Sequence, residues 1–409
     1  MHKKTKKMTD NKTVKINENV HWIGILDYDI RKFDIVMETK YGTTYNSYFI
    51  NGEKKAIIET AKEKFSDTYI EKVKQVVNPS EIDYIVLNHT EPDHSGSLKH
   101  LLEIAPKAKV VGSGNTIRYL KDMVEKDFEH VTIKDGDEIS LGNKTLKFIS
   151  APNLHWPDST YTYLVEDKLL FTCDSFGSHF CHDKIFDDLV GDFDDAFKYY
   201  FDVILRPYSK FMIKAIEKIR PLEINAICTG HGPILRTHWK KYVDLSEKYA
   251  LEYLKSMESH KKRVLIAYVS AYGYTKEMAE EIINGIKSVT DVNIDLADIE
   301  EMEIGELDSK LTISDAILVG SPTINQNILM PIYKLFAVIN PIRDNGKLAG
   351  SYGSYGWSGE GVKIIDSVLK NLKLNVAHDG VGLKFRPDSK DKGTLFEFGK
   401  EFAKKLLAC

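Results

Sequence analysis

Four side chains that can bind a metal ion occur within six residues of the segment NHTEPDHSG (88–96). They are His89, Glu91, Asp93 and His94, and they follow the apolar run EIDYIVL, which is typical of a short buried strand. Residues two apart on an extended strand end point the same way, so His89, Glu91 and Asp93 can converge, with His94 turned toward a neighbouring position. A charged loop that binds nothing is the alternative, because Asp and His are common in loops.

Three further potential ligands stand where other predicted strands end. His155 follows ISAPNL, Asp174 follows LLFTC and His231 follows AICTG. One histidine in such a place is more often a hydrogen-bonded structural residue, but three beside the first cluster argue against coincidence. Four imidazoles and three carboxylates are enough for two metal ions that share a bridging ligand. We therefore expect a two-metal site on one rim of a sheet.

A second motif, VSAYGYTKEMA (269–279), is a strand end, a short polar loop and the start of a helix. The hydroxyls of Ser270 and Thr275, the loop N–H groups and the helix N-terminus can together hold a phosphate. A simply capped helix is the alternative. The sequence has neither G-x-x-x-x-G-K-[ST] nor G-x-G-x-x-G, so neither an NTP-binding P-loop nor a dinucleotide site is supported.

Two later loops, GSPTINQNILMP (320–331) and GSYGSYGWSGEG (350–361), also follow apolar strands. In doubly wound folds ligands bind outside the carboxyl ends of the strands. Small residues permit close backbone approach to a flat ring, and Tyr352 or Trp357 can stack on it. Simple packing of these aromatic rings is the alternative.

The pattern of elements indicates two domains. Residues 14–60 alternate as antiparallel strands do, and later strands are interspersed with helical stretches at about 192–219 and 238–258. This pattern predicts a layered sheet domain with a site on one rim. After a linker at 256–262 the rhythm becomes strict β–α alternation, which predicts a parallel doubly wound sheet. We place the domains at residues 1–256 and 263–409.

The composition excludes several classes of protein. A chain of 409 residues is too long for one hydrophobic core. A net charge of −4 argues against a nucleic-acid partner, and the basic residues 1–12 are interpreted as a solvated tail. No apolar stretch suits a membrane span or a secretory signal, so we expect a cytoplasmic protein. The four cysteines form no C-x-x-C pair, so any redox chemistry must use groups other than cysteine.

The H-x-E-x-D-H motif with later His, Asp and His resembles the flavodiiron branch of the metallo-β-lactamase fold superfamily. The resemblance implies an α/β fold, with an αββα metallo-β-lactamase-like domain followed by a flavodoxin-like domain. It implies that one iron is bound by His89, Glu91 and His155, the other by Asp93, His94 and His231, and that Asp174 bridges them. The family varies at the position of His94, where the equivalent histidine does not always bind a metal.

Glu91 bears on the identity of the metal. The zinc hydrolases of the superfamily carry a histidine at this position. A carboxylate makes the site harder and more anionic, which suits iron better than zinc.

The three later loops together resemble the FMN site of flavodoxins. The resemblance assigns the phosphate to the loop of Ser270, Ala271, Tyr272, Gly273, Tyr274 and Thr275. It assigns the isoalloxazine to Ser321, Pro322, Thr323 and Asn325, and to Ser351, Tyr352, Gly353, Trp357 and Gly359.

The activity implied by the resemblance is the four-electron reduction of O₂ to water, as oxygen detoxification in an anaerobe. Electrons would come through FMN from reduced coenzyme F420, as in the F420-dependent oxidases of methanogenic archaea. Reduction of nitric oxide to N₂O, rubredoxin as the donor, a zinc hydrolase and a plain electron carrier are the alternatives. Similar proteins form head-to-tail homodimers, alone or as dimers of dimers. Tyr28 and Trp156 are candidates for gating an oxygen pocket.

Overall fold

The computed structural model describes residues 12–33, 37–258 and 261–408. The chain divides into two compact units, residues 1–258 and 259–409, and this division falls within the segment 256–262. Each unit has its own sheets and its own hydrophobic clusters.

Unit 1 is built on two large sheets. The first has the strand order β1-β2-β7-β8-β9-β10-β11 and the second the order β12-β13-β14-β15-β16; β3 pairs with β6 and β4 with β5. The strands are β1 (Val14–Lys15), β2 (Val20–Trp22), β3 (Ile25–Asp27), β4 (Lys32–Phe33), β5 (Met37–Glu38), β6 (Thr43–Tyr45), β7 (Tyr48–Asn51), β8 (Lys55–Ile58), β9 (Ile82–Val86), β10 (Lys109–Gly112), β11 (His130–Thr132), β12 (Glu138–Ser140), β13 (Thr145–Ser150), β14 (Thr160–Leu164), β15 (Leu169–Cys173) and β16 (Ala226–Thr229).

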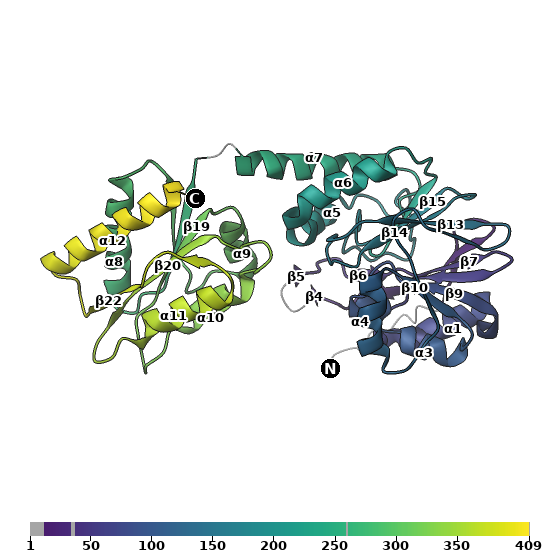
Figure 1. Cartoon of the computed structure of the whole chain (residues 1–409), viewed down its shortest axis with the longest axis horizontal. Coiled ribbons are helices and arrows are strands. Elements are labelled where there is room, and N and C mark those ends of the chain that lie inside the picture. The colour runs from purple at the N-terminus through teal and green to yellow at the C-terminus, as the bar shows by residue number, and fades with distance from the viewer. Residues whose placement is uncertain (1–11, 34–36, 259–260, 409) are drawn as a thin grey trace, which may run out of the picture. The chain divides into compact units, whose positions relative to one another are not determined.

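Six helices of unit 1 cover the outer faces of the two sheets (Figure 1). They are α1 (Ser66–Val76), α3 (Leu98–Ile104), α4 (Gly114–Val124), α5 (Asp194–Tyr200), α6 (Ser209–Ile219) and α7 (Trp239–Glu258). The short helix α2 (Pro92–Ser95) lies in the segment that follows β9. The stretch between α5 and α6 is a π-helical turn, Phe201–Leu205, followed by a 3₁₀ turn, Arg206–Tyr208.

Alternation along the strands separates three apolar layers in unit 1. On β15, Leu169 and Phe171 point into the cluster between the sheets, whereas Leu170 packs against α5, α6 and α7. On β8, Ala56 and Ile58 face the inter-sheet cluster and Ile57 faces α1, α3 and α4. Side chains of a strand alternate between the faces of its sheet, so this pattern yields four layers in the order helix, sheet, sheet, helix.

The strands that precede the candidate ligands end at one rim. In the first sheet β8, β9 and β10 run parallel, and in the second sheet β15 and β16 run parallel. Parallel neighbours place their carboxyl ends on the same edge. The residues that follow β9, β15 and β16 therefore come out on a common side of each sheet.

Unit 2 is a parallel sheet with the order β18-β17-β19-β20-β21, in which β22 also pairs with β20. Its strands are β17 (Arg263–Tyr268), β18 (Asn293–Asp298), β19 (Ala316–Gly320), β20 (Leu348–Tyr355), β21 (Asn375–Val376) and β22 (Val381–Lys384). Its helices are α8 (Tyr274–Lys287), α9 (Ile304–Thr312), α10 (Met330–Val338), α11 (Glu360–Asn371) and α12 (Ser389–Ala408).

Both faces of this sheet are covered by helices (Figure 1). One apolar cluster joins Leu265 and Ala267 of β17 to α9, α10 and α11, and the other joins Val264 and Ile266 to α8 and α12. A strand that is buried on both faces has apolar residues at successive positions. This explains why the sequence RVLIAYV does not alternate between apolar and polar residues. The strand order, counted along the chain as 2-1-3-4-5, is that of the flavodoxin-like fold.

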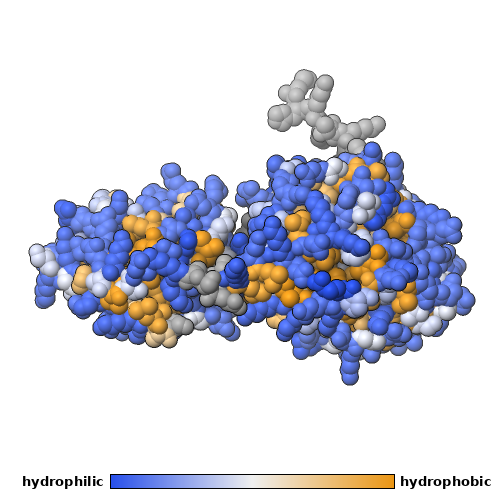
Figure 2. Space-filling view, turned by 90° about the horizontal axis from the view of Figure 1, so that it is seen from above, coloured by the Kyte–Doolittle hydropathy of each residue, from blue (hydrophilic) through white to orange (hydrophobic). Residues whose placement is uncertain are grey.

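The face of each unit that is seen in Figure 2 is predominantly hydrophilic, with hydrophobic patches between the polar residues. Among the described residues, we find no helix with the length and apolar character needed to span a bilayer.

Candidate metal centre and flavin site

The segment after β9 does not remain extended through all four of its potential ligands. Pro92 starts the short helix α2, so Asp93 and His94 lie on a helical turn while His89 and Glu91 precede it. Proline favours the first helical position because its φ angle is fixed near the helical value. The expectation that Asp93 would point with His89 and Glu91 along one strand end was therefore wrong, and the turn sends the two pairs to different places.

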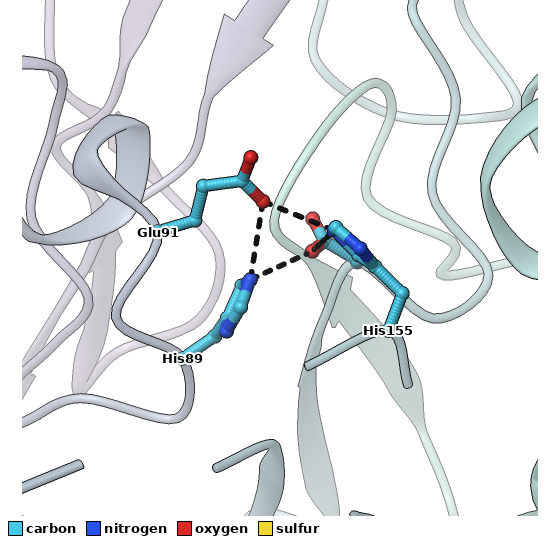
Figure 3. A group of neighbouring side chains, drawn as sticks. His89, Glu91 and His155 are labelled. Atoms are coloured by element: carbon cyan, nitrogen blue, oxygen red, sulfur yellow. Dashed lines mark hydrogen bonds and ion pairs between the residues drawn. The ribbon is translucent and has the colours of Figure 1, made fainter. Parts of the chain in front are cut away.

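The first group consists of His89, Glu91 and His155 (Figure 3). The Oε2 atom of Glu91 lies 3.2 Å from Nε2 of His89 and 3.0 Å from Nε2 of His155. The His89 side chain is fully buried and the Glu91 side chain is 13% exposed. Two imidazole nitrogens and a carboxylate oxygen thus face one point from two separate loops.

The second group consists of Asp93, His94 and His231. The Oδ2 atom of Asp93 lies 3.1 Å from Nε2 of His231 and 3.6 Å from Nε2 of His94. The Nδ1 atom of His231 is 2.5 Å from the backbone carbonyl of Thr44, so Nδ1 carries the proton and Nε2 is left to face the group.

Asp174 stands between the two groups. Its Oδ2 atom lies 3.5 Å from Nε2 of both His89 and His155, and its Oδ1 atom lies 3.0 Å from Nε2 of His94 and 3.4 Å from Nε2 of His231. Each oxygen of this one carboxylate therefore faces a different pair of histidines. That is the geometry a bridging ligand between two metal ions requires.

The electrostatics of the two groups are those of a cation site. Burial alone lowers the pKa of the imidazoles, but the surrounding carboxylates outweigh burial and raise the pKa of His89, His94 and His155 to about 10. Burial opposes ionisation of the carboxylates, yet the histidines hold the pKa values of Glu91, Asp93 and Asp174 below their usual range. Metal ions would replace the protons on these imidazoles.

Buried oxygens without hydrogen-bond donors give an independent test of fit. Among the described residues, both carboxylate oxygens of Asp93 and Oδ2 of Asp174 are buried and accept no hydrogen bond. A buried polar atom left in this state is costly unless something else binds it. Hard carboxylate oxygens with imidazole nitrogens suit iron ions, so the residues present fit a di-iron site.

Sequence reasoning missed several residues that surround the groups. The Tyr200 hydroxyl donates to Oδ1 of Asp174 at 3.1 Å, from the residue just before the π-helical turn. The ring centroid of His179 lies 5.3 Å from that of His231, and burial followed by the charge of His231 lowers the pKa of His179 to about 3. His179 is therefore a neutral, buried imidazole. Its position after DSFG at the end of β15 was an available signal, whereas Tyr200 was one tyrosine among many in a helical stretch.

The candidate gating residues are placed differently. Trp156 meets His89 edge-on at 5.1 Å between ring centroids. Tyr28 is 37% exposed, on the segment after β3. Phe33, which the sequence did not single out, stacks on His179 at 4.6 Å and meets His231 edge-on at 5.6 Å.

The proposed flavin loops lie together at one edge of unit 2. Tyr268, Gly320 and Tyr352 are in register across β17, β19 and β20, so the loops that follow these strands are neighbours. Hydrogen bonds connect these loops. The Thr275 hydroxyl lies 3.2 Å from the Ser354 hydroxyl, and the Thr323 N–H donates to the Ser354 carbonyl.

Some residues of the first flavin loop are exposed, and others are buried or make hydrogen bonds within unit 2. Ala271 and Tyr272 are exposed, and Gly273 adopts a left-handed conformation with φ of 83° just before α8. The Ser270 hydroxyl accepts a hydrogen bond from the Lys276 N–H at 3.3 Å, which ties the loop to the first turn of α8. Thr275 is buried. The loop thus has exposed backbone at a helix N-terminus, the arrangement that binds phosphate.

The third flavin loop is shorter than expected. Ser351, Tyr352 and Gly353 are buried inside β20, and the Ser351 hydroxyl donates to Asp366 at 2.6 Å. The Tyr352 ring fills space beside Gly320, where an added Cβ would lie 2.5 Å from the Tyr352 hydroxyl. The expectation that Tyr352 could stack on a flavin was therefore wrong, because its ring belongs to the core.

Trp357 is the exposed aromatic residue of this loop. Its side chain is 75% exposed, and with Tyr355 and Gly359 it lines a cleft of about 880 Å³. In the second loop, Ser321 and Pro322 are buried, Thr323 is half-buried and Asn325 is exposed with φ of 52°. Among the described residues, the lining of this cleft comes from the end of β20 and the loop after it, from α11 and from residues 379–382, and it includes no residue of the Ser270–Thr275 or Ser321–Asn325 loops.

Each unit of the chain matches a known protein family. Residues 43–232 match the family described as "ODP family beta lactamase", and residues 266–399 match the family described as "Flavodoxin". The Flavo-diiron protein FprA2 of Clostridium acetobutylicum is 42% identical over 405 residues, which cover 96% of this chain and 99% of that protein. The chain belongs to the flavodiiron proteins.

Other relatives agree with this membership. The flavodiiron chain is 39% identical to the Type A flavoprotein fprA of Rhodobacter capsulatus, over 96% of this chain and 90% of that protein. The solved structure of the rubredoxin oxygen:oxidoreductase from Desulfovibrio gigas matches it with a TM-score of 0.71 at 28% identity, covering 97% of this chain and 99% of that one. Flavodiiron proteins are oxidoreductases that reduce O₂ or NO with FMN and a di-iron site. The predicted fold class, a metallo-β-lactamase-like domain followed by a flavodoxin-like domain, is confirmed.

Proposed function

We propose that this flavodiiron protein reduces O₂ to water at a di-iron site, with electrons that pass through FMN from reduced coenzyme F420. The observation that carries the proposal is the position of Asp174, whose two carboxylate oxygens face two separate groups of histidine and carboxylate ligands. Such a carboxylate holds two metal ions close enough together to act on one small molecule.

The ligand types favour iron. Each group supplies two imidazoles and one carboxylate besides Asp174: His89, His155 and Glu91 in the first, and His94, His231 and Asp93 in the second. Two histidines and one carboxylate leave coordination positions open on iron for a small ligand. We propose these seven residues as the complete set of metal ligands.

The rest of the chain fits a four-electron reaction. When bound, two ferrous ions and one reduced FMN together supply the four electrons that convert O₂ into two waters. The exposed loop backbone at Ala271–Gly273 would hold the FMN phosphate, and Trp357 would contact the isoalloxazine ring. Tyr200, which donates to Asp174, would hold the bridging carboxylate in orientation. Electrons must pass over a short distance from FMN to the iron ions. We therefore propose a head-to-tail homodimer, in which the FMN of one chain lies beside the iron ions of the other. We also propose that the protein is cytoplasmic.

The electron donor to FMN is a separate part of the proposal. The chain is 35% identical, over 95% of its length, to an uncharacterised protein of the methanogen Methanocaldococcus jannaschii. The name of that relative states no electron donor, so reduced F420 is proposed from the resemblance of the sequence to the F420-dependent oxidases of methanogenic archaea. Rubredoxin is the alternative donor, because the similar Desulfovibrio gigas protein is a rubredoxin oxygen:oxidoreductase.

The test is steady-state turnover of the purified protein loaded with iron and FMN. Reduced F420, reduced rubredoxin and NADH are compared as donors, and O₂ and NO as acceptors. We expect the largest kcat/KM with reduced F420 and O₂. Higher turnover with NO would make the protein a nitric oxide reductase, and turnover with rubredoxin alone would replace the donor. Failure of every pair would overturn the oxidoreductase proposal.

A further inference from the structure

We propose that Asp158 is a positioning residue that fixes the tautomer of His89 and aligns all three ligands of the first group. The inference rests on the proposed two-metal site. The Asp158 side chain is fully buried and reaches from the loop that carries His155 to the loop that carries His89. Asp158 was not among the candidate residues drawn from the sequence.

The first contact of Asp158 sets the protonation of His89. Its Oδ1 atom lies 3.2 Å from Nδ1 of His89. A carboxylate only accepts hydrogen bonds, so Nδ1 keeps its proton, and Nε2 is the nitrogen that gives up its proton when a metal ion binds. That nitrogen is the one that faces Glu91 and Asp174. A carboxylate behind a histidine ligand fixes ring orientation and raises ligand basicity.

The second contact of Asp158 holds the neighbouring backbone. Its Oδ2 atom accepts hydrogen bonds from the backbone N–H of Thr90 at 2.8 Å and from the Thr90 hydroxyl at 2.7 Å. Thr90 is the residue between His89 and Glu91. One carboxylate therefore holds the middle of the H-x-E segment as well as the first ligand.

The third link runs to the loop of His155. Asp158 follows His155 by three residues, and its backbone carbonyl accepts a hydrogen bond from the Ser113 hydroxyl at 3.1 Å. The loop is thus held from both sides, by the H-x-E segment and by the start of α4. Asp158 connects the two loops whose ligands must meet at one metal ion.

Replacing Asp158 by asparagine is a nearly isosteric test of this role. The two donors of Thr90 need an acceptor, so the amide oxygen turns to Thr90 and the amide NH₂ faces Nδ1 of His89. Nδ1 must then accept, and the proton moves to Nε2, the nitrogen that would bind the metal. We expect Asp158→Asn to weaken one metal-binding step by about 10-fold to 100-fold and to leave the other unchanged.

Asp187 provides a matched control in the same unit. Its side chain is also buried, accepts hydrogen bonds from three backbone N–H groups, and lies 3.2 Å from Nδ1 of His238. His238 is exposed and outside both groups. Asp187→Asn therefore removes a similar carboxylate–histidine pair without touching a ligand. We expect both metal-binding steps to keep their wild-type affinity in this variant.

The experiment is calorimetric titration of the metal-free full-length chain with Co(II), with the visible absorption of bound cobalt as a second readout. Wild type, Asp158→Asn, Asp187→Asn, His89→Asn and the double variant Asp158→Asn/His89→Asn are compared. If Asp158 acts through His89, the double variant binds cobalt no more weakly than His89→Asn alone.

The cobalt titrations distinguish a failure of the role of Asp158 from a failure of the proposed two-metal site. Fewer than two cobalt ions on the wild-type chain would overturn the two-metal site. Two ions on wild type with unchanged binding by Asp158→Asn would overturn only the role of Asp158. Full additivity of the two substitutions, or equal weakening of both steps, would show that Asp158 acts on the fold and not through His89.

Discussion

The Nε2 atom of His94 lies 3.0 Å from Oδ1 of Asp174, while the other oxygen of the same carboxylate faces His89 and His155. His94 is on the helical turn after β9 and Asp174 follows β15, so the contact joins the rims of the two sheets of unit 1.

Replacing Asp174 by asparagine should disrupt both metal positions. The amide has one acceptor oxygen where the carboxylate has two, so it can face only one of the two pairs of histidines. We expect the iron content of the purified variant to fall from about two ions per chain to about one or none. Elemental analysis of the purified protein, with iron quantified per chain, checks this.

The control for Asp174→Asn is His182→Asn, which lies eight residues further along the same segment. His182 pairs with Asp183 at 3.0 Å and belongs to neither ligand group. Iron content equal to wild type is expected for this variant. Two irons per chain in Asp174→Asn would show that the carboxylate does not bridge.

Replacing Glu91 by histidine should shift the metal preference toward zinc. The substitution removes a negative charge from the first group and adds a softer nitrogen donor. We expect the ratio of Zn(II) to Fe(II) affinities to rise by about tenfold or more. Anaerobic competition of the two ions for the metal-free protein measures this ratio. An unchanged ratio would mean that Glu91 does not select the metal.

Metal binding should release protons over a wide pH range. The pKa values of His89, His94 and His155 are raised to about 10, so near pH 7.5 these imidazoles carry protons in the metal-free protein. A metal ion must displace those protons, so its affinity rises with pH and levels off above about pH 10. We expect roughly three protons to be released per fully loaded chain.

Titration of Co(II) into the metal-free protein in two buffers of different ionisation enthalpy gives the number of protons released. A value near zero at pH 7.5 would show that the histidines are already neutral. The imidazoles would then not pair with the carboxylates in the way their distances indicate.

Replacing Trp357 by alanine should weaken FMN binding. Trp357 is exposed beside the cleft, and an aromatic contact contributes about 0.5–1.5 kcal/mol, a factor of about 2 to 12 in Kd. Quenching of FMN fluorescence by the flavin-free protein measures Kd. The comparison is Tyr352→Phe, which removes only a buried hydroxyl that has no hydrogen-bond partner among the described residues. We expect its FMN affinity to equal that of wild type, and weaker binding would mean that Tyr352 does contact the flavin.

The sequence by itself determined the order of domains and the residues that could act as ligands. Alternation and continuous apolar runs set which strands are buried on one face or on two, because side-chain periodicity follows from local backbone geometry. The candidate ligands could be found because each follows an apolar strand within a few residues, and Asp174 and His231 follow theirs most directly.

Only the tertiary structure decided how the candidate ligands divide into two groups and which other side chains position them. The split of the H-x-E-x-D-H segment depends on the turn at Pro92 and on loops more than sixty residues away. Asp158 meets His89 across 69 positions and Tyr200 meets Asp174 across 26, separations that carry no local periodicity. Tyr352 and Trp357 looked alike in one loop, but strand β20 extends to Tyr355, so pairing with β19 and β22 buries the first and leaves the second exposed. Local pattern cannot show where a strand stops when its length is set by its neighbours.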